Sequence, residues 1–331
     1  MRPLQCCQKG LKGKQRMNLW DKSVIIFFIL FLFGSTSSAE PKTVAVVTGE
    51  EFVSYERALK GFKQAVTESG QDLRLFEYKV PNDPNGLKDF IQKLHSFRPD
   101  LILTVGSKST ELISKEIKNI PIVFSSVLNP EVSGFIASKE SPGSNLTGAS
   151  LDIPIKIQLE KFKLLVPRIR RIGVLYTSQT KKLIEVAKIC ADSLNLVLVS
   201  SLIDSEKEIP FALEKLRGKI EGLWAVADEN IFTPQSTQFI LLFTLRNSLP
   251  LMGINPGMVE NGALFTLACD YKDVGRQSGI LALKILSGIA PSQIPVSVPR
   301  IIYLYLNQKT AKQIELKLSP DLVKVAKEVY Q

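Results

Sequence analysis

Small polar side chains follow several apolar runs of this chain, at the point where each run gives way to a turn. Ser107 and Ser109 follow the run Leu101–Val105, and the next run ends in Ser125 and Ser126. The same place after other predicted strands is taken by Ser150, Tyr176, Asp228, Asn230 and Asn255. Hydroxyl, amide and carboxylate groups that converge at strand ends can bind a small polar or zwitterionic ligand.

Each of these residues also has an ordinary structural role. Serine, asparagine and aspartate are the common N-caps of helices, so a single polar residue after a strand is explained by capping. Repetition at most of the strand ends favours a binding site. Asp228 is the acid best placed for an amino or other donor group of a ligand, and its alternative role is the N-cap of the helix that follows.

Catalytic patterns are weak in this sequence. His95 is the only histidine, and it lies in a predicted helix away from every predicted site turn, so a Ser or Cys triad lacks its base. The first strand is followed by Thr48-Gly49-Glu50-Glu51 instead of a glycine-rich nucleotide loop, and no cysteine or histidine spacing indicates a metal. The acids that could serve acid–base chemistry are ordinarily solvated loop residues: Asp228, Glu229, Asp270 and Asp273. We therefore expect no enzyme and no cofactor.

The elements that position the polar turns follow from the hydrophobic pattern. Leu101–Val105 is typical of a strand buried on both faces, Lys108–Ile117 of a helix, and Ile122–Phe124 of a second strand. Strand, helix and strand in this order form a parallel crossover unit. Its turns Gly106–Ser109 and Ser125–Asn129 then lie at the carboxyl ends of neighbouring strands, where open α/β sheets bind ligands.

The alternation of strands and helices starts again after Leu151–Pro154. Two similar β/α halves are better explained by two lobes than by one very large sheet. After the second half, Asp270–Ser287 predicts an amphipathic helix and Arg300–Leu306 a strand, and two short helical stretches close the chain.

The N-terminal stretch predicts secretion. Basic residues gather in Met1–Lys22, an apolar block covers Ser23–Phe33, and small residues at Ser37–Ala39 precede Glu40. This order is typical of a signal peptide over residues 1–39, and a complete signal also begins at Met17. An uncleaved anchor is the alternative, although the block is short for a membrane span. We expect a periplasmic or otherwise extracytoplasmic protein.

Without residues 1–39 the chain has a small net charge and two cysteines. The whole chain has a formal charge of +10, but without residues 1–39 it keeps 36 basic and 31 acidic residues, a charge of +5. The run Arg168–Arg171 fits a solvated turn, so nothing favours binding to nucleic acid. Cys190 and Cys269 both lie in apolar surroundings, and a disulfide between them is the alternative in an oxidising compartment.

Six segments in order, from about Thr43 to Leu316, resemble one bacterial family. They are PDLILTVGSKST, IPIVFSSVLNPEVSGF, SNLTGASLDIP, RIGVLYTS, DYKDVGRQSGILALKIL and IYLYLNQKTAKQIEL. The family is that of the ABC transporter substrate-binding proteins of the tryptophan/tyrosine-uptake type. Each segment alone is common, but the six in sequence behind a signal peptide are specific.

The resemblance implies an α/β fold of the periplasmic-binding-protein type I. Two doubly wound, Rossmann-like lobes are joined by a three-segment hinge and enclose a ligand between them. Lobe 1 would comprise residues 43–151 and 270–298, and lobe 2 residues 152–269 and 299–331. The hinge would cross near Leu151–Pro154, Cys269–Tyr271 and Val298–Ile301, and the helix Asp270–Ser287 should return to the strands of lobe 1.

Carried over position by position, the resemblance places the ligand at Ser107, Lys108, Ser109, Ser125, Ser126, Ser150, Tyr176, Asp228, Asn230 and Asn255. Similar proteins hold the ligand carboxylate with hydroxyls and amides of the first lobe. This chain departs from the pattern twice. Lys108 stands in a turn that is usually small and neutral, and Gly253–Pro256 replaces a segment that often has a serine with an acid.

We therefore expect a secreted, monomeric solute-binding component of an ABC importer, with a membrane permease and an ATPase as partners. Its ligand would be small and polar or zwitterionic, such as an aromatic amino acid. The alternative is a sensing module of the same fold that reports to a membrane receptor. A transcription regulator of this fold would carry a helix-turn-helix before Val44, where the signal peptide stands.

Overall fold

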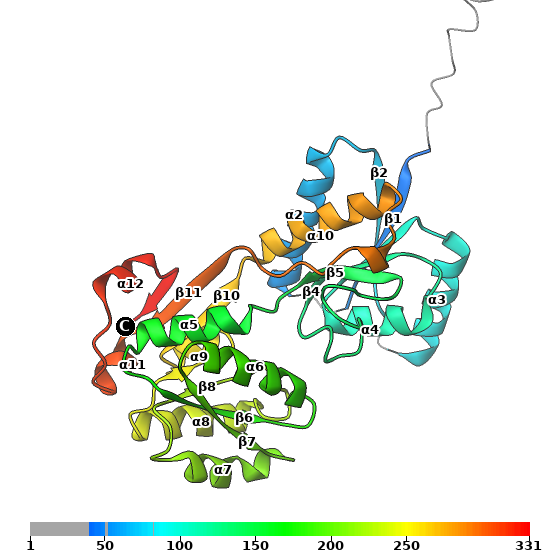
Figure 1. Ribbon diagram of the computed structural model, residues 1–331. Helices are drawn as coiled ribbons and strands as arrows, with labels where there is room; N and C mark the ends of the chain where they lie inside the picture. Colours follow the sequence, from blue (N-terminus) through cyan, green and yellow to red (C-terminus); the bar gives the residue numbers. More distant parts are fainter. Residues whose placement is uncertain (1–39, 50–51, 82) are drawn as a thin grey trace, which may run out of the picture. The chain divides into compact units, whose positions relative to one another are not determined.

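Short apolar runs alternate with amphipathic helices along the chain, and most form the element that their spacing predicts. The computed structural model describes residues 40–49, 52–81 and 83–331. From Pro41 to Gln331 the chain holds two β-sheets with helices packed on them (Figure 1). The predicted signal peptide lies outside the described residues.

The first sheet is parallel throughout, with the strand order β2-β1-β3-β4-β5. Its strands are β1 (Lys42–Thr48), β2 (Leu73–Lys79), β3 (Leu101–Val105), β4 (Ile122–Val127) and β5 (Leu146–Ser150). Every residue of β3, β4 and β5 is buried, as expected of strands covered on both faces.

Helices cover both faces of this sheet. On one face lie α3 (Pro84–Phe97) and α4 (Ser107–Glu116), which bury side chains such as Leu94 and Ile113 against the strands. On the other face lie α2 (Val53–Glu68) and α10 (Tyr271–Leu286), which bury Phe62 and Leu281. Two apolar layers therefore hold the sheet between them.

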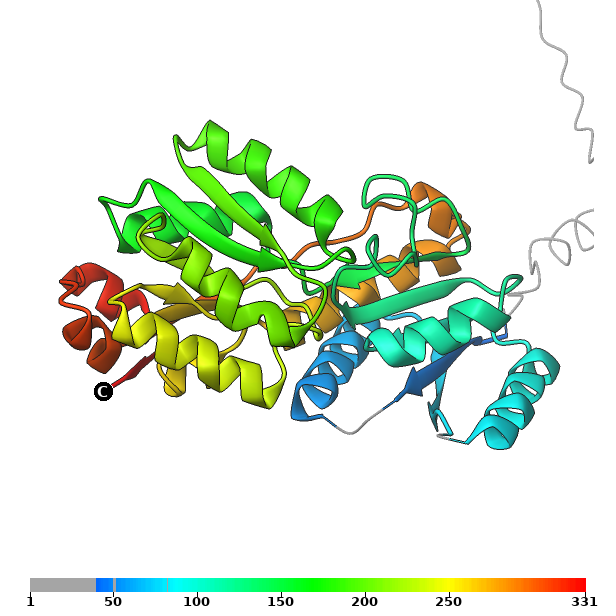
Figure 2. The same cartoon turned by 90° about the horizontal axis from the view of Figure 1, so that it is seen from below.

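The helix α10 follows the last parallel strand of the second sheet but packs on the first sheet. It lies beside α2 and also contacts β4 and β5 (Figures 1 and 2). The approach is close at glycines: a Cβ placed on Gly275 would lie 1.8 Å from the carbonyl oxygen of Ala58, and one on Gly61 would lie 1.9 Å from that of Lys272. The prediction that this helix returns to the first strands is confirmed.

The second sheet has the strand order β12-β11-β10-β9-β8-β6-β7. Its strands are β6 (Arg171–Tyr176), β7 (Val197–Leu202), β8 (Gly222–Trp224), β9 (Leu251–Met252), β10 (Phe265–Cys269), β11 (Ile302–Asn307) and β12 (Glu328–Tyr330). The pair β10–β11 is antiparallel, and the other pairs are parallel.

The remaining helices belong to this second sheet or to its connections. They are α5 (Ile155–Leu165), α6 (Lys181–Ser193), η1 (Glu206–Glu208), α7 (Ile209–Leu216), α8 (Pro234–Arg246), α9 (Pro256–Glu260), η2 (Pro291–Gln293), α11 (Gln308–Gln313) and α12 (Pro320–Val325). One apolar cluster joins α5 and α6 to the sheet, and a second joins α7 and α8. Both sheets are thus covered on two faces, which is the doubly wound α/β architecture that the sequence predicts.

The chain passes between the sheets three times: after β5, after β10 and before β11. The third segment runs along β5, where Ser150 donates its N–H to the Ser297 carbonyl at 2.9 Å. Because residues 41–331 form one unit by their contacts, the bounds of the two lobes stay a prediction.

Several bounds differ from the sequence prediction. β4 runs on through Ser125 and Ser126 to Val127, because its pairing with β5 resumes after a register shift at these serines. Two short elements, α9 and β12, have too few residues to show an apolar period.

In the described ranges, the helices are all too short or too polar to cross a membrane.

Candidate functional site

The serines that follow β3 and those near the end of β4 lie together at the carboxyl end of the first sheet. Gly106 donates its N–H to the Ser125 carbonyl at 2.9 Å, so the start of α4 lies next to the end of β4. Gly106 has φ 92°, and a Cβ there would lie 2.5 Å from the Tyr55 hydroxyl oxygen. Both facts require glycine at this turn. We call Ser107, Ser109, Ser125 and Ser126 the serine cluster.

Two members of the serine cluster carry unpaired hydroxyls. Ser125 and Ser126 are 1% and 2% exposed, and neither Oγ has a hydrogen-bond partner among the described residues. Ser126 also has φ 60°, a left-handed conformation that costs a non-glycine residue energy. A buried, unpaired polar group costs about 1–3 kcal/mol, so a hydrogen-bond partner would stabilise each of these two hydroxyls.

The other predicted residues of the first sheet are arranged differently. Ser109 donates its hydroxyl to the Val105 carbonyl at 2.7 Å, and the Ser150 hydroxyl accepts from the Asp152 N–H at 3.3 Å. Ser107 is half-buried as the first residue of α4, and Lys108 is exposed. Ser109 therefore has a structural role, while Ser107 and Lys108 are the first two residues of α4.

A second group of predicted residues gathers at the ends of β6 and β8. One carboxylate oxygen of Asp228 accepts from the hydroxyls of Thr177 at 2.7 Å and Thr180 at 2.9 Å. The other accepts from the Asn230 N–H at 3.1 Å. Asp228 is 6% exposed and joins these two turns. The alternative that it caps the next helix is wrong, because Thr233 caps α8.

The last three predicted residues lie around this second group. Tyr176 ends β6, half-buried against the apolar core, and Asn230 is exposed. The side chain of Asn255 caps α9 by accepting from the Met258 N–H at 3.0 Å. Asn255 also lines a separate groove of about 580 Å³ between α8 and α9.

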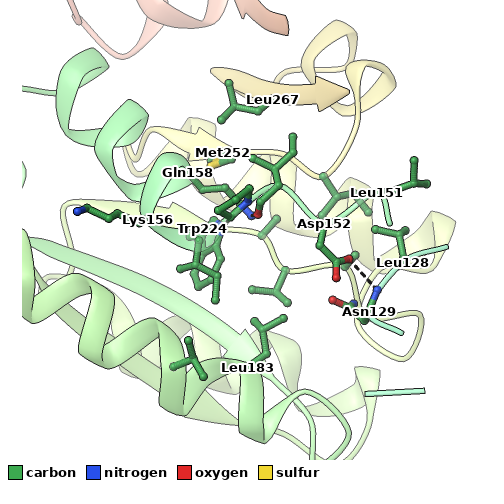
Figure 3. A pocket seen from close by; sticks show the side chains of 18 of the residues that line it. Leu128, Asn129, Leu151, Asp152, Lys156, Gln158, Leu183, Trp224, Met252 and Leu267 are labelled. Atoms are coloured by element: carbon green, nitrogen blue, oxygen red, sulfur yellow. Dashed lines mark hydrogen bonds between the residues drawn. The ribbon is translucent and has the colours of Figure 1, made fainter. Parts of the chain in front are cut away.

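A pocket of about 390 Å³ lies at the first segment between the sheets (Figure 3). Its walls come from residues 151–154, the start of α5, one side of α6, the ends of β8 and β9 and the middle of β10. Most of these side chains are apolar, and they include Leu151, Leu183, Trp224, Met252 and Leu267. We call this the hinge pocket. Its lining includes chain neighbours of the predicted turns, namely Leu128, Ala227 and Ile254.

A carboxylate stands at the rim of the hinge pocket. Asp152 accepts from the Asn129 N–H at 2.7 Å and pairs with the Lys139 ammonium at 2.9 Å (Figure 3). Lys139 also accepts at its carbonyl from the Val296 N–H at 2.7 Å. Asp152 therefore links the first segment to the loop after β4, and Lys139 links that loop to the third segment.

The indole of Trp224 forms part of the pocket wall with its N–H already bonded. Nε1 donates to the Gln158 side-chain oxygen at 2.9 Å, and the Gln158 amide donates to the Ile153 carbonyl at 2.7 Å. Sequence reasoning missed both residues and also Asp152. One signal was present, since Trp224 is the only tryptophan after residue 39 and lies within an apolar run.

The second and third segments are joined by charged hydrogen bonds. Asp270 caps α10 by accepting from the N–H groups of Lys272 at 2.8 Å and Asp273 at 3.1 Å, and it accepts from the Tyr303 hydroxyl at 2.7 Å. Burial by itself would raise the pKa of Asp270, but these three donors outweigh it and lower the pKa below its ordinary value. Arg300 pairs with Asp273 at 2.5 Å.

The cysteines and acids of the described part serve no metal. Cys190 and Cys269 are both free, so the alternative of a disulfide between them is wrong. Burial raises the pKa of the Cys269 thiol to about 11, which makes it inert. Within residues 40–49, 52–81 and 83–331, we find no cluster of three or more His, Cys, Asp or Glu that could hold a metal ion.

A sequence model of the family described as "ABC transporter substrate binding protein" matches residues 43–330. The chain belongs to this family. Members of this family are described as substrate-binding proteins.

Relatives of this substrate-binding protein span nearly the whole match. A tyrosine-binding protein from Clostridioides difficile (strain R20291) is 29% identical over 300 residues, which are 88% of this chain and 86% of the relative. An uncharacterised protein from Rickettsia prowazekii (strain Madrid E) is 27% identical over 295 residues, which are 88% of this chain and 91% of the relative.

Solved structures agree on the fold. A ligand-free, open substrate-binding protein with adhesive properties from Clostridium difficile has a TM-score of 0.72 at 24% identity, covering 88% of this chain and 99% of that one. An ABC domain in complex with L-Trp from Streptococcus pneumonia has a TM-score of 0.64 at 22% identity, covering 88% and 100%. The fold is that of the type I periplasmic binding proteins, as the sequence predicts.

The ten predicted contact residues of this substrate-binding protein fall into separate groups. The structure brings the serine cluster together, and it joins Asp228 to Asn230. Asn255 lies apart, on the α8/α9 groove. That these residues contact a ligand stays a prediction.

Proposed function

We propose that this protein is the secreted solute-binding component of an ABC importer and that it captures an aromatic amino acid between its two lobes. The lobes would comprise residues 43–151 with 270–298 and residues 152–269 with 299–331. The observation that carries the proposal is the pair of buried, unpaired hydroxyls on Ser125 and Ser126 at the end of a parallel strand. Neutral donors at this place suit a carboxylate.

The carboxylate of the ligand would lie on the serine cluster. The hydroxyls of Ser125 and Ser126 and the N–H of Ser107 at the start of α4 are donors of the right kind. Each hydrogen bond contributes about 0.5–1.5 kcal/mol net. The Asp228 side chain would face the ligand's amino group from the second lobe.

The apolar part of the ligand would enter the hinge pocket. The pocket has a volume of about 390 Å³, which falls in the range of about 300–1,000 Å³ for small-molecule sites. Its mostly apolar wall suits an aromatic ring better than a sugar. Similar proteins support the same ligand class, since one is named a tyrosine-binding protein and another was solved in complex with L-Trp.

A membrane permease and an ATPase would be the partners, and the protein would act as a monomer outside the cytoplasm. Support comes from the family, whose members serve ABC transporters. A cellular uptake assay separates this role from ligand sensing. Deleting the gene should abolish uptake of the labelled amino acid, whereas loss of a sensing module would leave uptake intact.

Calorimetry with the purified secreted protein tests the ligand assignment. We expect L-tyrosine or L-tryptophan to bind and to be recovered unchanged, and tyramine and tryptamine, which lack the carboxylate, to bind at least about tenfold more weakly.

Ser126→Ala should weaken amino-acid binding by about two- to tenfold, because one donor is lost. The control Ser133→Ala, on an exposed loop residue, should bind like the wild type. Equal binding of tyrosine and tyramine would show that the carboxylate does not bind at the serine cluster.

A further inference from the structure

We propose that Gln158 is a positioning residue that couples the hinge pocket to the segments joining the two lobes. The proposal rests on the proposed function, because it assigns a role at the same pocket. Its starting point is one half-buried amide that makes two hydrogen bonds in opposite directions.

The two bonds join the pocket wall to the first segment. The Gln158 oxygen accepts the indole N–H of Trp224 at 2.9 Å, and its nitrogen donates to the Ile153 carbonyl at 2.7 Å. Figure 3 shows Gln158 beside Trp224 at the pocket. Because the amide is planar, its oxygen and nitrogen move together. A shift of the indole therefore displaces the partner of the Ile153 carbonyl.

The contacts continue into the first sheet. The residue before Ile153 is Asp152, whose carboxylate accepts from the Asn129 N–H at 2.7 Å. Asn129 follows the end of β4, where the unpaired serine hydroxyls lie. A continuous chain of contacts therefore runs from Trp224 through Gln158 and the first segment to the loop after β4. Contiguous contacts of this kind can carry coupling between two sites.

The hydrogen bond between Trp224 and Gln158 also determines which part of the indole a ligand can contact. With its N–H bonded to Gln158, the Trp224 indole presents only apolar ring surface. A ligand ring that packs on the indole therefore acts on Gln158 without competing for a hydrogen bond. Gln158 thus sets both the position and the chemistry of this wall.

Fluorescence can report on Trp224 alone, because it is the only tryptophan after residue 39. Gln158→Met removes both hydrogen bonds at similar side-chain length, and Gln158→Glu keeps the acceptor for the indole but removes the donor to Ile153. The control is Gln313→Met, at an exposed position on α11.

We expect Gln158→Met to shift the emission of the ligand-free protein and Gln158→Glu to keep the wild-type emission. Both should weaken amino-acid binding by about three- to thirtyfold, while the control stays unchanged. If Gln158 only supported the indole, a variant with wild-type emission would also keep wild-type affinity. Weaker binding by Gln158→Glu with unchanged emission therefore indicates coupling through the Ile153 carbonyl. Wild-type affinity in both Gln158 variants would overturn the proposal.

Amide hydrogen exchange of the ligand-free protein tests the coupling without any ligand. In Gln158→Met the Asn129 amide should exchange several-fold faster than in the wild type, although it lies on the loop after β4. Unchanged exchange at Asn129 would overturn the relay even if the protein binds its amino acid. Faster exchange in a protein that binds no amino acid would overturn only the proposed function.

Discussion

At the residue scale, Asp228 has a structural role that its position in the sequence did not indicate. Its position after an apolar run indicates a ligand contact or a cap, and the structure shows a third role. It accepts hydrogen bonds from Thr177, Thr180 and Asn230 and so joins two turns. Asn230 lies in the same turn as Asp228, whereas Thr177 and Thr180 are distant in sequence. Only the fold brings these two hydroxyls to the Asp228 carboxylate.

Asp228→Ala should therefore lower stability. The change leaves two buried threonine hydroxyls without their acceptor, which costs about 1–3 kcal/mol in the free energy of unfolding. Urea denaturation measures the loss, and Glu229→Ala, at the exposed neighbour, should stay within about 0.5 kcal/mol of the wild type. Wild-type stability with lost amino-acid binding would instead make Asp228 chiefly a ligand contact.

Asp270 predicts a pH dependence with a defined sign. Its pKa is lowered in the folded protein by the Tyr303 hydroxyl and two backbone donors, which overcome the opposing effect of burial. A lowered folded pKa stabilises the protein above the unfolded value of about 3.9, and this contribution is lost as the pH falls through the folded pKa. We expect the stability difference between wild type and Asp270→Asn to be constant from about pH 5 to 8 and to shrink below about pH 4.

Denaturation curves of both proteins at several pH values measure this difference. Asp83→Asn is a useful control, because the exposed Asp83 also caps a helix by accepting from a backbone N–H. A difference that grows as the pH falls would contradict the assignment to Asp270.

At the scale of elements, the periodicity of apolar residues predicts only part of the contact between α2 and α10. The apolar stripe of α10, with Val274, Leu281 and Ile285, could be read directly from the sequence. The depth of the contact could not, because it depends on glycines meeting carbonyl groups of another helix. The return of α10 to the first sheet came from the family resemblance and not from the stripe.

Gly275→Ala should destabilise the protein. The new Cβ would lie 1.8 Å from the Ala58 carbonyl oxygen, a backbone atom that can move only if the helices separate. Overpacking of this kind costs about 1–3 kcal/mol or more. Gly49→Ala is the matched control, since its Cβ would lie 3.8 Å from the nearest atom. Equal denaturation midpoints for the two variants would contradict the close crossing.

Other elements were hidden from the sequence for local reasons. β4 continues through Ser125 and Ser126, although two serines are not typical of a buried strand, because pairing with β5 holds them. The helix α9 has five residues and begins at Pro256 after the Asn255 cap, too short for a periodic signal. Both exceptions lie next to predicted ligand turns, where local preference and global fold often disagree.

At the scale of the whole molecule, the fold class followed from element order and the site followed only in part. The serine cluster could be placed because parallel strands bring their carboxyl ends to one edge of a sheet. The hinge pocket could not be placed, because its wall combines α6, the strands β8 to β10 and the first segment. Gln158 and Trp224 lie on different elements, and no spacing in the sequence connects them.

Three segments between two sheets should act as a hinge, and ligand should close it. We expect a smaller radius of gyration by small-angle scattering when L-tyrosine or L-tryptophan saturates the protein, because a ligand held by both lobes draws them together. Tyramine at the same concentration is the control. The same amino acid should also raise the melting temperature, since binding only the folded state stabilises it by about 2.7 kcal/mol at one hundred times the dissociation constant. Binding seen by calorimetry with an unchanged radius of gyration would mean that the ligand contacts one lobe alone.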